Sequence, residues 1–112
     1  MNPKDLVRLR HIYDAACEAL SFASGRARED LNTDRQLVLA LVKEIEIIGE
    51  AASRLSSETR QQIPALPWTD IILMRNRLIH AYFDVDSDVV WKTLTDDLPP
   101  LIEELEKRLS RD

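Results

Sequence analysis

The feature that most constrains the fold is a long apolar stripe with helical spacing between residues 33 and 55. Residues that recur every three or four positions lie on one face of an α-helix. The members of this stripe are Leu37, Leu41, Ile45, Ile48, Ala52 and Leu55. Thr33 followed by Gln36 has the pattern of a capping box, so we expect the helix to begin there.

A second set of apolar residues on this helix, which includes Val38, Val42, Ile47 and Ala51, widens its apolar surface. Two interpretations remain open. Either a second chain packs on the extra surface, or the helix is the central one of a bundle and is buried all round. Gly49 would weaken the helix unless another element approaches it closely, so it indicates tight packing.

The rest of the chain also favours helices over strands. Asn2 and Pro3 are suited to the start of a first helix that ends near Gly25, and further apolar patterns begin near Trp68, Ser87 and Leu98. The sequence has only two glycines, and 45% of its residues are hydrophobic. We therefore expect an all-α fold, an antiparallel four- to five-helix bundle, with residues 1–112 as a single domain.

The sequence contains no stretch that approaches the roughly 20 apolar residues of a membrane span, and its start does not resemble a signal peptide. We expect a cytoplasmic protein without membrane contact. A net charge of −5 argues against a surface covered with nucleic-acid-binding residues. Any contact with RNA must therefore be local.

Polar and charged residues gather in the stretch "RNRLIHAYFDVD", at the end of the helix that begins near Trp68. If that helix continues through this stretch, Asn76 and His80 share one face, while Arg75 and Tyr82 share the neighbouring face. Two interpretations are possible. Arg75 and His80 could simply cap the last helix carbonyls, or they could form a chemical site.

An arginine with a histidine is the minimum set that can cleave RNA without a metal ion. The guanidinium of Arg75 would hold the phosphate and stabilise its developing charge, while the imidazole of His80 would act as general acid or base. One histidine cannot fill both proton-transfer roles at once. A two-fold dimer would supply a second copy of each group across one cleft.

The sequence offers no comparable metal or cofactor site. Asp84, Asp86 and Asp88 alternate after the helix, but this segment lacks the glycine and the terminal glutamate of a calcium loop. A solvated acidic turn accounts for them better. We therefore expect neither a metal ion nor a cofactor.

These motifs resemble the HEPN superfamily (higher eukaryotes and prokaryotes nucleotide-binding), and in particular its HepT-like branch. The family's Arg-x4-His-x-Tyr motif reads here as Arg75, "NRLI", His80, Ala81 and Tyr82. Supporting segments, in the family's order, are "EIEIIGEAASRLS", "PALPWTDIILMRNRLIHAYFDVD", "VVWKTL" and "LPPLIEELEK". The resemblance covers nearly the whole chain and favours the chemical site over the helix cap.

The resemblance implies a metal-independent endoribonuclease toxin that acts as a homodimer. Its partner would be a minimal nucleotidyltransferase antitoxin, MntA-like, which neutralises the toxin by transferring AMP to the motif tyrosine, here Tyr82. Arg75 and His80 would be the catalytic residues, and Asn76 would orient the histidine or the substrate. Alternatively, the chain is a non-catalytic helical dimerisation module that binds a nucleotide or a partner, with Tyr82 simply packed at the helix end.

Overall fold

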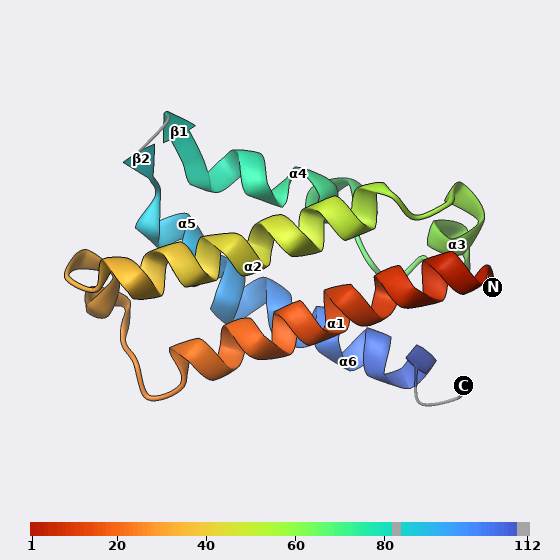
Figure 1. The fold of residues 1–112 in the computed structure, drawn as a ribbon, viewed down its shortest axis with the longest axis horizontal. Coiled ribbons are helices and arrows are strands. Elements are labelled where there is room, and N and C mark those ends of the chain that lie inside the picture. The colour runs from red at the N-terminus through yellow and green to blue at the C-terminus, as the bar shows by residue number, and fades with distance from the viewer. Residues whose placement is uncertain (82–83, 110–112) are drawn as a thin grey trace.

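The computed structural model describes residues 1–81 and 84–109, with the side chains of residues 79–81 left out. Helices follow one another along the chain, interrupted by one two-stranded hairpin (Figure 1). The elements are α1 (Pro3–Ala23), the 3₁₀ turn η1 (Arg28–Asn32), α2 (Arg35–Ser53), α3 (Ser57–Gln62), α4 (Trp68–Leu78), β1 (Ile79–Ala81), β2 (Asp84–Val85), α5 (Ser87–Lys92), the π-helical turn η2 (Thr93–Asp97) and α6 (Leu98–Leu109). The expected all-α fold is confirmed.

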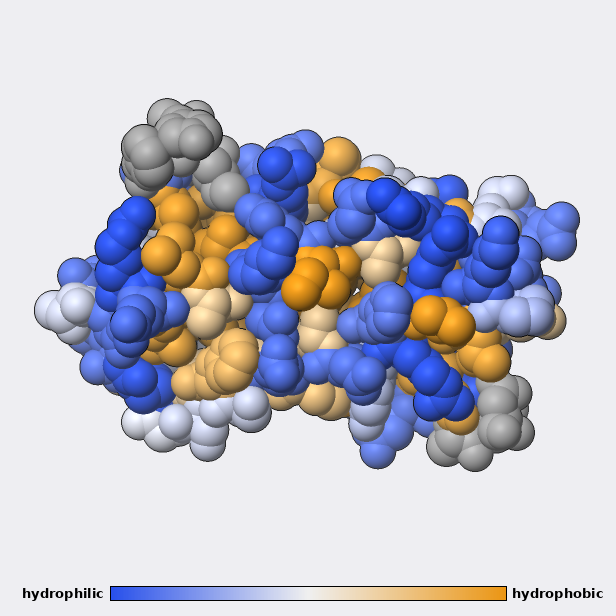
Figure 2. Space-filling model, in the orientation of Figure 1, coloured by the Kyte–Doolittle hydropathy of each residue, from blue (hydrophilic) through white to orange (hydrophobic). Residues whose placement is uncertain are grey.

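Helix α2 lies between α1 and α4 and runs antiparallel to both, while α6 runs along the other side of α1 (Figure 1). The second apolar set of α2 packs largely against the same chain, because Val38, Val42 and Ala51 are buried and Ile47 is half-buried. On the face shown in Figure 2, apolar side chains form separate areas divided by hydrophilic ones. The structure therefore favours the central-helix interpretation of this surface.

The helix starts show where local sequence rules succeed and where they do not. Asn2 caps α1 as expected, because its side chain accepts a hydrogen bond from the Lys4 backbone N–H at 2.8 Å. The expected start of α2 at Thr33 is wrong by one residue. Asp34 is the N-cap instead, and its carboxylate accepts from the Leu37 N–H at 3.0 Å. Arg26 holds that carboxylate at 2.7 Å, a contact that no local pattern reveals.

A buried carboxylate joins the start of α1 to the start of α3. The side chain of Asp5 is only 1% exposed, and it accepts hydrogen bonds from the hydroxyls of Ser56 and Thr59, each at 2.6 Å. These bonds, with that of Ser56 first, lower the pKa of Asp5, because they favour its charged form. The N-terminal end of α1 is therefore fixed to the segment that follows α2.

Helix α4 packs closely on α2 at Gly49, as the glycine indicated. A Cβ at this position would lie 3.3 Å from the backbone oxygen of Ile72 and 3.6 Å from that of Ile71. A side chain here would be in tight contact with the Ile72 carbonyl, so glycine favours the close approach of the two helix backbones. This contact sets the distance between α4 and α2, and therefore also the position of Arg75 relative to α2.

Helix α4 ends at Leu78, earlier than the helical continuation through Tyr82 that the sequence analysis considered. Residues 79–81 pair instead with Asp84–Val85 as antiparallel strands, and the Asp86 N–H donates to the Leu78 carbonyl at 2.6 Å. The expectation that Asn76 and His80 share one helix face is therefore wrong, because His80 has strand backbone. Tyr82 lies outside the described residues.

The last two helices are continuous, joined by the π-helical turn η2, rather than restarted at the two prolines. Asp86, not Ser87, is the N-cap of α5, since its side chain accepts from the N–H groups of Asp88 and Val89. Within residues 1–81 and 84–109, no helix is both long enough and apolar enough to cross a membrane.

One carboxyl group is buried in the core without a cation. Glu44 on α2 is 5% exposed, and its Oε2 atom has no hydrogen-bond partner. Burial, and then the hydrogen bond and negative charge of the neighbouring Glu18 on α1, raise the pKa of Glu44 to about 7. Glu44 is therefore protonated in the folded state over a pH range in which it ionises when the chain unfolds.

We expect Gly49→Val to destabilise the fold by about 2 kcal/mol, because the added methyl groups overpack the contact with α4. Gln36→Val, at an exposed position of α2, controls for the lower helix propensity of valine. Urea unfolding of both variants tests this. Equal stability of Gly49→Val and the parent protein would show that the contact can relax without cost.

We expect Glu44→Gln to remove a pH dependence of stability. The folded-state pKa of about 7 lies above the ordinary value of 4.5, so the stability linked to Glu44 is complete below 4.5 and is lost as pH rises through 7. Above that pH, the variant should gain roughly 2–3 kcal/mol over the parent. Glu18→Gln should give a smaller gain, because burial remains. The test is to measure the unfolding free energies of the parent and the variants between about pH 4 and about pH 8. If the curves of free energy against pH are parallel for the parent and Glu44→Gln, the prediction is wrong.

Candidate functional site

Arg75, the first residue of the sequence motif, lies near the C-terminal end of α4 and is available to a ligand. Its side chain is 61% exposed, and its Nε atom lies 3.9 Å from the Glu46 Oε1 atom on α2. That separation is at the outer limit of an ion pair, so Glu46 orients the guanidinium without occupying all of its donors. Arg75 can therefore bind an anion that enters from solvent.

The other motif residues are less closely defined. Asn76 is exposed on α4 beside Arg75. His80 follows in β1, five residues after Arg75, and its side chain lies outside the described part of the chain. Tyr82 is outside the described residues altogether. The structure thus brings the backbones of Arg75, Asn76 and His80 to one end of α4, at the entry to the hairpin.

Arg77, two residues after Arg75, has a different environment. Its guanidinium pairs with Asp70 of the same helix at 2.7 Å, and both side chains are more than half exposed. Such an exposed pair contributes little to stability, but it occupies the arginine. Arg77 is therefore a surface residue, and it provides a matched control for Arg75.

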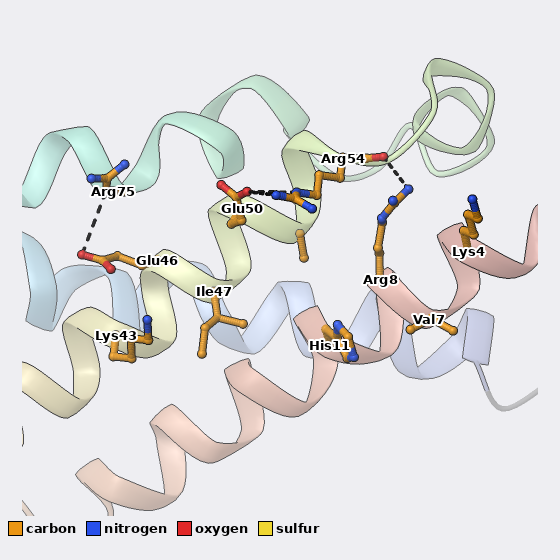
Figure 3. Close-up of a pocket in the computed structure, with 11 residues that line it drawn as sticks. Lys4, Val7, Arg8, His11, Lys43, Glu46, Ile47, Glu50, Arg54 and Arg75 are labelled. Carbon is orange, nitrogen blue, oxygen red and sulfur yellow. Dashed lines mark hydrogen bonds and ion pairs between the residues drawn. The ribbon is translucent and has the colours of Figure 1, made fainter.

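Arg75 also lines a cleft of about 770 Å³ between α1, α2 and α4, which we call the α1–α2–α4 cleft (Figure 3). The cleft is rich in cations despite the acidic composition of the chain. Its charged and titratable residues are Lys4, Arg8 and His11 from α1, Lys43, Glu46, Glu50 and Arg54 from the α2 segment, and Arg75 from α4. Val7, Ile47 and Ala51 supply apolar surface between them.

Several of these groups are held by contacts within the chain. Glu50 pairs with Arg54 at 2.8 Å, one helical turn further along. Arg8 donates to the Arg54 backbone oxygen at 2.8 Å and lies 3.4 Å from Asp5. Within residues 1–81 and 84–109, neither Lys4 nor Lys43 forms an ion pair. The two lysines are therefore the cations of the cleft that can bind a ligand without breaking an internal ion pair.

The motif did not reveal these cleft residues, although one signal was present in the sequence. Lys4, Arg8 and His11 recur at helical spacing on α1, as Lys43, Glu46, Glu50 and Arg54 do on α2. Each set predicts a polar helix face. Only the packing of α1 beside α2 makes the two faces into one cleft and places His11, far from His80 in the sequence, on the same cleft as Arg75.

Comparison with known proteins finds relatives that match most of the chain. The family model described as "Ribonuclease HepT-like" matches residues 12–108. A protein named "Probable ribonuclease HepT" from Thermococcus cleftensis is 40% identical over 79 residues, which cover 70% of this chain and 72% of that protein.

Two further relatives match over greater lengths. A protein from Caldanaerobacter subterraneus subsp. tengcongensis, named "Putative RNase", is 34% identical over 93% of this chain and 93% of its own length. A protein from Methanocaldococcus jannaschii with the same description is 30% identical over 88% of this chain and 90% of its own length. No solved structure matches the chain at a comparable level of significance.

Proposed function

This chain belongs to the HepT-like ribonuclease family, and from that premise we propose that it is a metal-independent endoribonuclease that cleaves phosphodiester bonds in RNA. The observation that carries the proposal is that the full Arg-x4-His-x-Tyr motif lies within the matched residues, with Arg75 exposed and only loosely paired. RNA is the substrate that the names of the relatives indicate. The motif residues suit this substrate, because a guanidinium can bind the phosphate and an imidazole can transfer a proton.

In the proposed reaction, the RNA 2′-oxygen attacks the adjacent phosphorus while a base takes its proton. The bond from phosphorus to the 5′-oxygen then breaks, and an acid protonates the leaving oxygen. Arg75 binds the non-bridging oxygens and stabilises their charge in the transition state. His80 is the general acid or base, and Asn76, exposed beside Arg75, orients the substrate or the histidine.

We propose that the active form is a homodimer, because two proton transfers need two titratable groups and the motif supplies one histidine per chain. The spare surface of α2 no longer supports this idea, since most of it is buried within the chain. The exposed Leu73 offers another contact. It is 43% exposed and lies three residues before Asn76, on the same side of α4.

The resemblance also leads us to propose a toxin and antitoxin pair. The partner would be a minimal nucleotidyltransferase of the MntA-like type, which uses ATP to adenylylate Tyr82. The tyrosine oxygen would attack the α-phosphorus of ATP, pyrophosphate would leave, and the phenolic proton would go to solvent. The new phosphodiester would add a negative charge seven residues after Arg75 and two residues after His80, where it would compete with the RNA phosphate for the motif.

We expect Arg75→Ala and His80→Ala each to lower RNA cleavage by at least about 100-fold, because each removes a group that acts in the transition state. Arg77→Ala should cleave RNA as the parent does, because Arg77 is occupied by Asp70. Cleavage should persist in the presence of EDTA. Gel assays with a labelled RNA measure all of these rates, and circular dichroism verifies the fold of each variant.

Cleavage retained in both Arg75→Ala and His80→Ala would overturn the catalytic assignment. If the purified parent protein binds a nucleotide or the partner tightly but never cuts RNA, the non-catalytic helical module is the correct function. Light scattering of the parent protein tests the homodimer separately.

We expect the cognate nucleotidyltransferase with ATP to add one adenylyl group to the chain and to abolish RNA cleavage. Tyr82→Phe should remain unmodified and should keep its activity under the same conditions, because it lacks the accepting oxygen. Tyr13→Phe is the matched control and should still be modified. Intact-mass spectrometry gives the readout, and modification of Tyr82→Phe would place the acceptor elsewhere.

A further inference from the structure

We propose that the α1–α2–α4 cleft binds a single RNA strand on one side of the cleaved phosphodiester, with Lys4 and Lys43 as phosphate-binding residues. The inference rests on the proposed ribonuclease function, since it extends the substrate site outward from Arg75. It assigns substrate binding to residues of α1 and α2 that lie outside the sequence motif.

The charge of the cleft is the first argument. Five lysines and arginines line it, against two glutamates, although the chain as a whole carries a net charge of −5. Local clustering of cations on an otherwise acidic protein is the electrostatic footprint of a phosphate-binding surface. It also satisfies the expectation that any RNA contact in this chain must be local.

The pairing of these charges is the second argument. Arg54 neutralises Glu50 at 2.8 Å, so that glutamate does not repel a phosphate strongly. Lys4 and Lys43 are exposed and have no ion-pair partner within the described residues. Binding a phosphate at these two lysines therefore displaces only water and counterions, which is the source of favourable free energy in nucleic-acid binding.

The shape of the cleft favours a strand over a single phosphate ion. Lys43 and Arg54 are eleven residues apart on the α2 segment, which corresponds to about 17 Å along a helix axis. Figure 3 shows Arg75 near one end of the cleft and Lys4 at the other, with Ile47 and Val7 between them. Such apolar surface suits the faces of unpaired bases, whereas a duplex would keep its bases stacked.

Binding is tested with a fluorescently labelled single-stranded RNA and His80→Ala protein, which should not cleave it. We expect Lys4→Ala with Lys43→Ala to weaken binding roughly tenfold and to reduce the slope of log K against log salt by about 1.4, or 0.7 for each phosphate contact. Lys92→Ala with Lys107→Ala is the matched control, because both lysines line a different cleft, between α4 and α6. Equal affinity and slope in the two double variants would overturn the proposal.

Cleavage by protein with His80 intact separates this inference from the proposed function. We expect Lys4→Ala with Lys43→Ala to lower kcat/KM on a long RNA by a similar factor. The same variant should cleave a dinucleoside monophosphate at the parental rate, because that substrate carries no phosphate beyond the one that is cleaved. If the parent cleaves RNA and the lysine variant is unaffected, only the cleft assignment fails. If the parent cleaves neither substrate, the ribonuclease proposal fails. The binding experiment then still tests whether Lys4 and Lys43 bind RNA.

A second copy of this acidic chain is the main competing occupant of the cleft. Light scattering of the same lysine variants addresses it directly. A change from dimer to monomer with unchanged RNA binding would make the cleft a subunit interface and would overturn the proposal. An unchanged oligomeric state with weakened RNA binding supports it.

Discussion

The close approach of α4 to α2 at Gly49 is the contact on which the geometry of the candidate site depends. A side chain there would meet the backbone carbonyls of Ile71 and Ile72, so the distance between the two helices is set by the main chain itself. Arg75 lies one turn further along α4, so the same spacing of the two helices determines how far it lies from α2. Its weak pairing with Glu46 across the same helix pair follows from this arrangement.

The opposite wall of the cleft is fixed by polar contacts instead of close backbone packing. Asp5 joins α1 to α3 through Ser56 and Thr59, and Arg8 joins α1 to the end of α2 through the Arg54 carbonyl. These bonds hold the N-terminal end of α1 beside α2. Lys4 and Lys43, the two cleft lysines without an ion pair, are therefore carried by helices whose positions are fixed before a ligand binds. Such preorganisation lowers the entropy cost of binding.

Much of the fold could be predicted from the sequence, because it depends on local rules. The apolar period of residues 37–55 and the cap at Asn2 each act within one helix, and both predictions are confirmed. The start of α2 was misplaced because Thr33 and Asp34 are both good caps, and the choice between them depends on Arg26, eight residues before Asp34. The early end of α4 depends on pairing with residues 84–85.

The candidate site also has a part that could be predicted from the sequence and a part that could not. The linear motif identified Arg75, Asn76, His80 and Tyr82, and their roles remain proposals. The cations of α1 and α2 could not be predicted to act together, because the spacing along each helix shows a face but not the neighbour that the face meets. That information resides in tertiary packing, as does the burial of Glu44 beside Glu18.

The hydrogen bond between the Asp86 N–H and the Leu78 carbonyl closes the hairpin of β1 and β2 at its base. The main chain leaves the bundle and returns to it at nearly the same point. A hairpin closed in this way can carry reactive side chains at the end of α4 while the helical core below it keeps its packing.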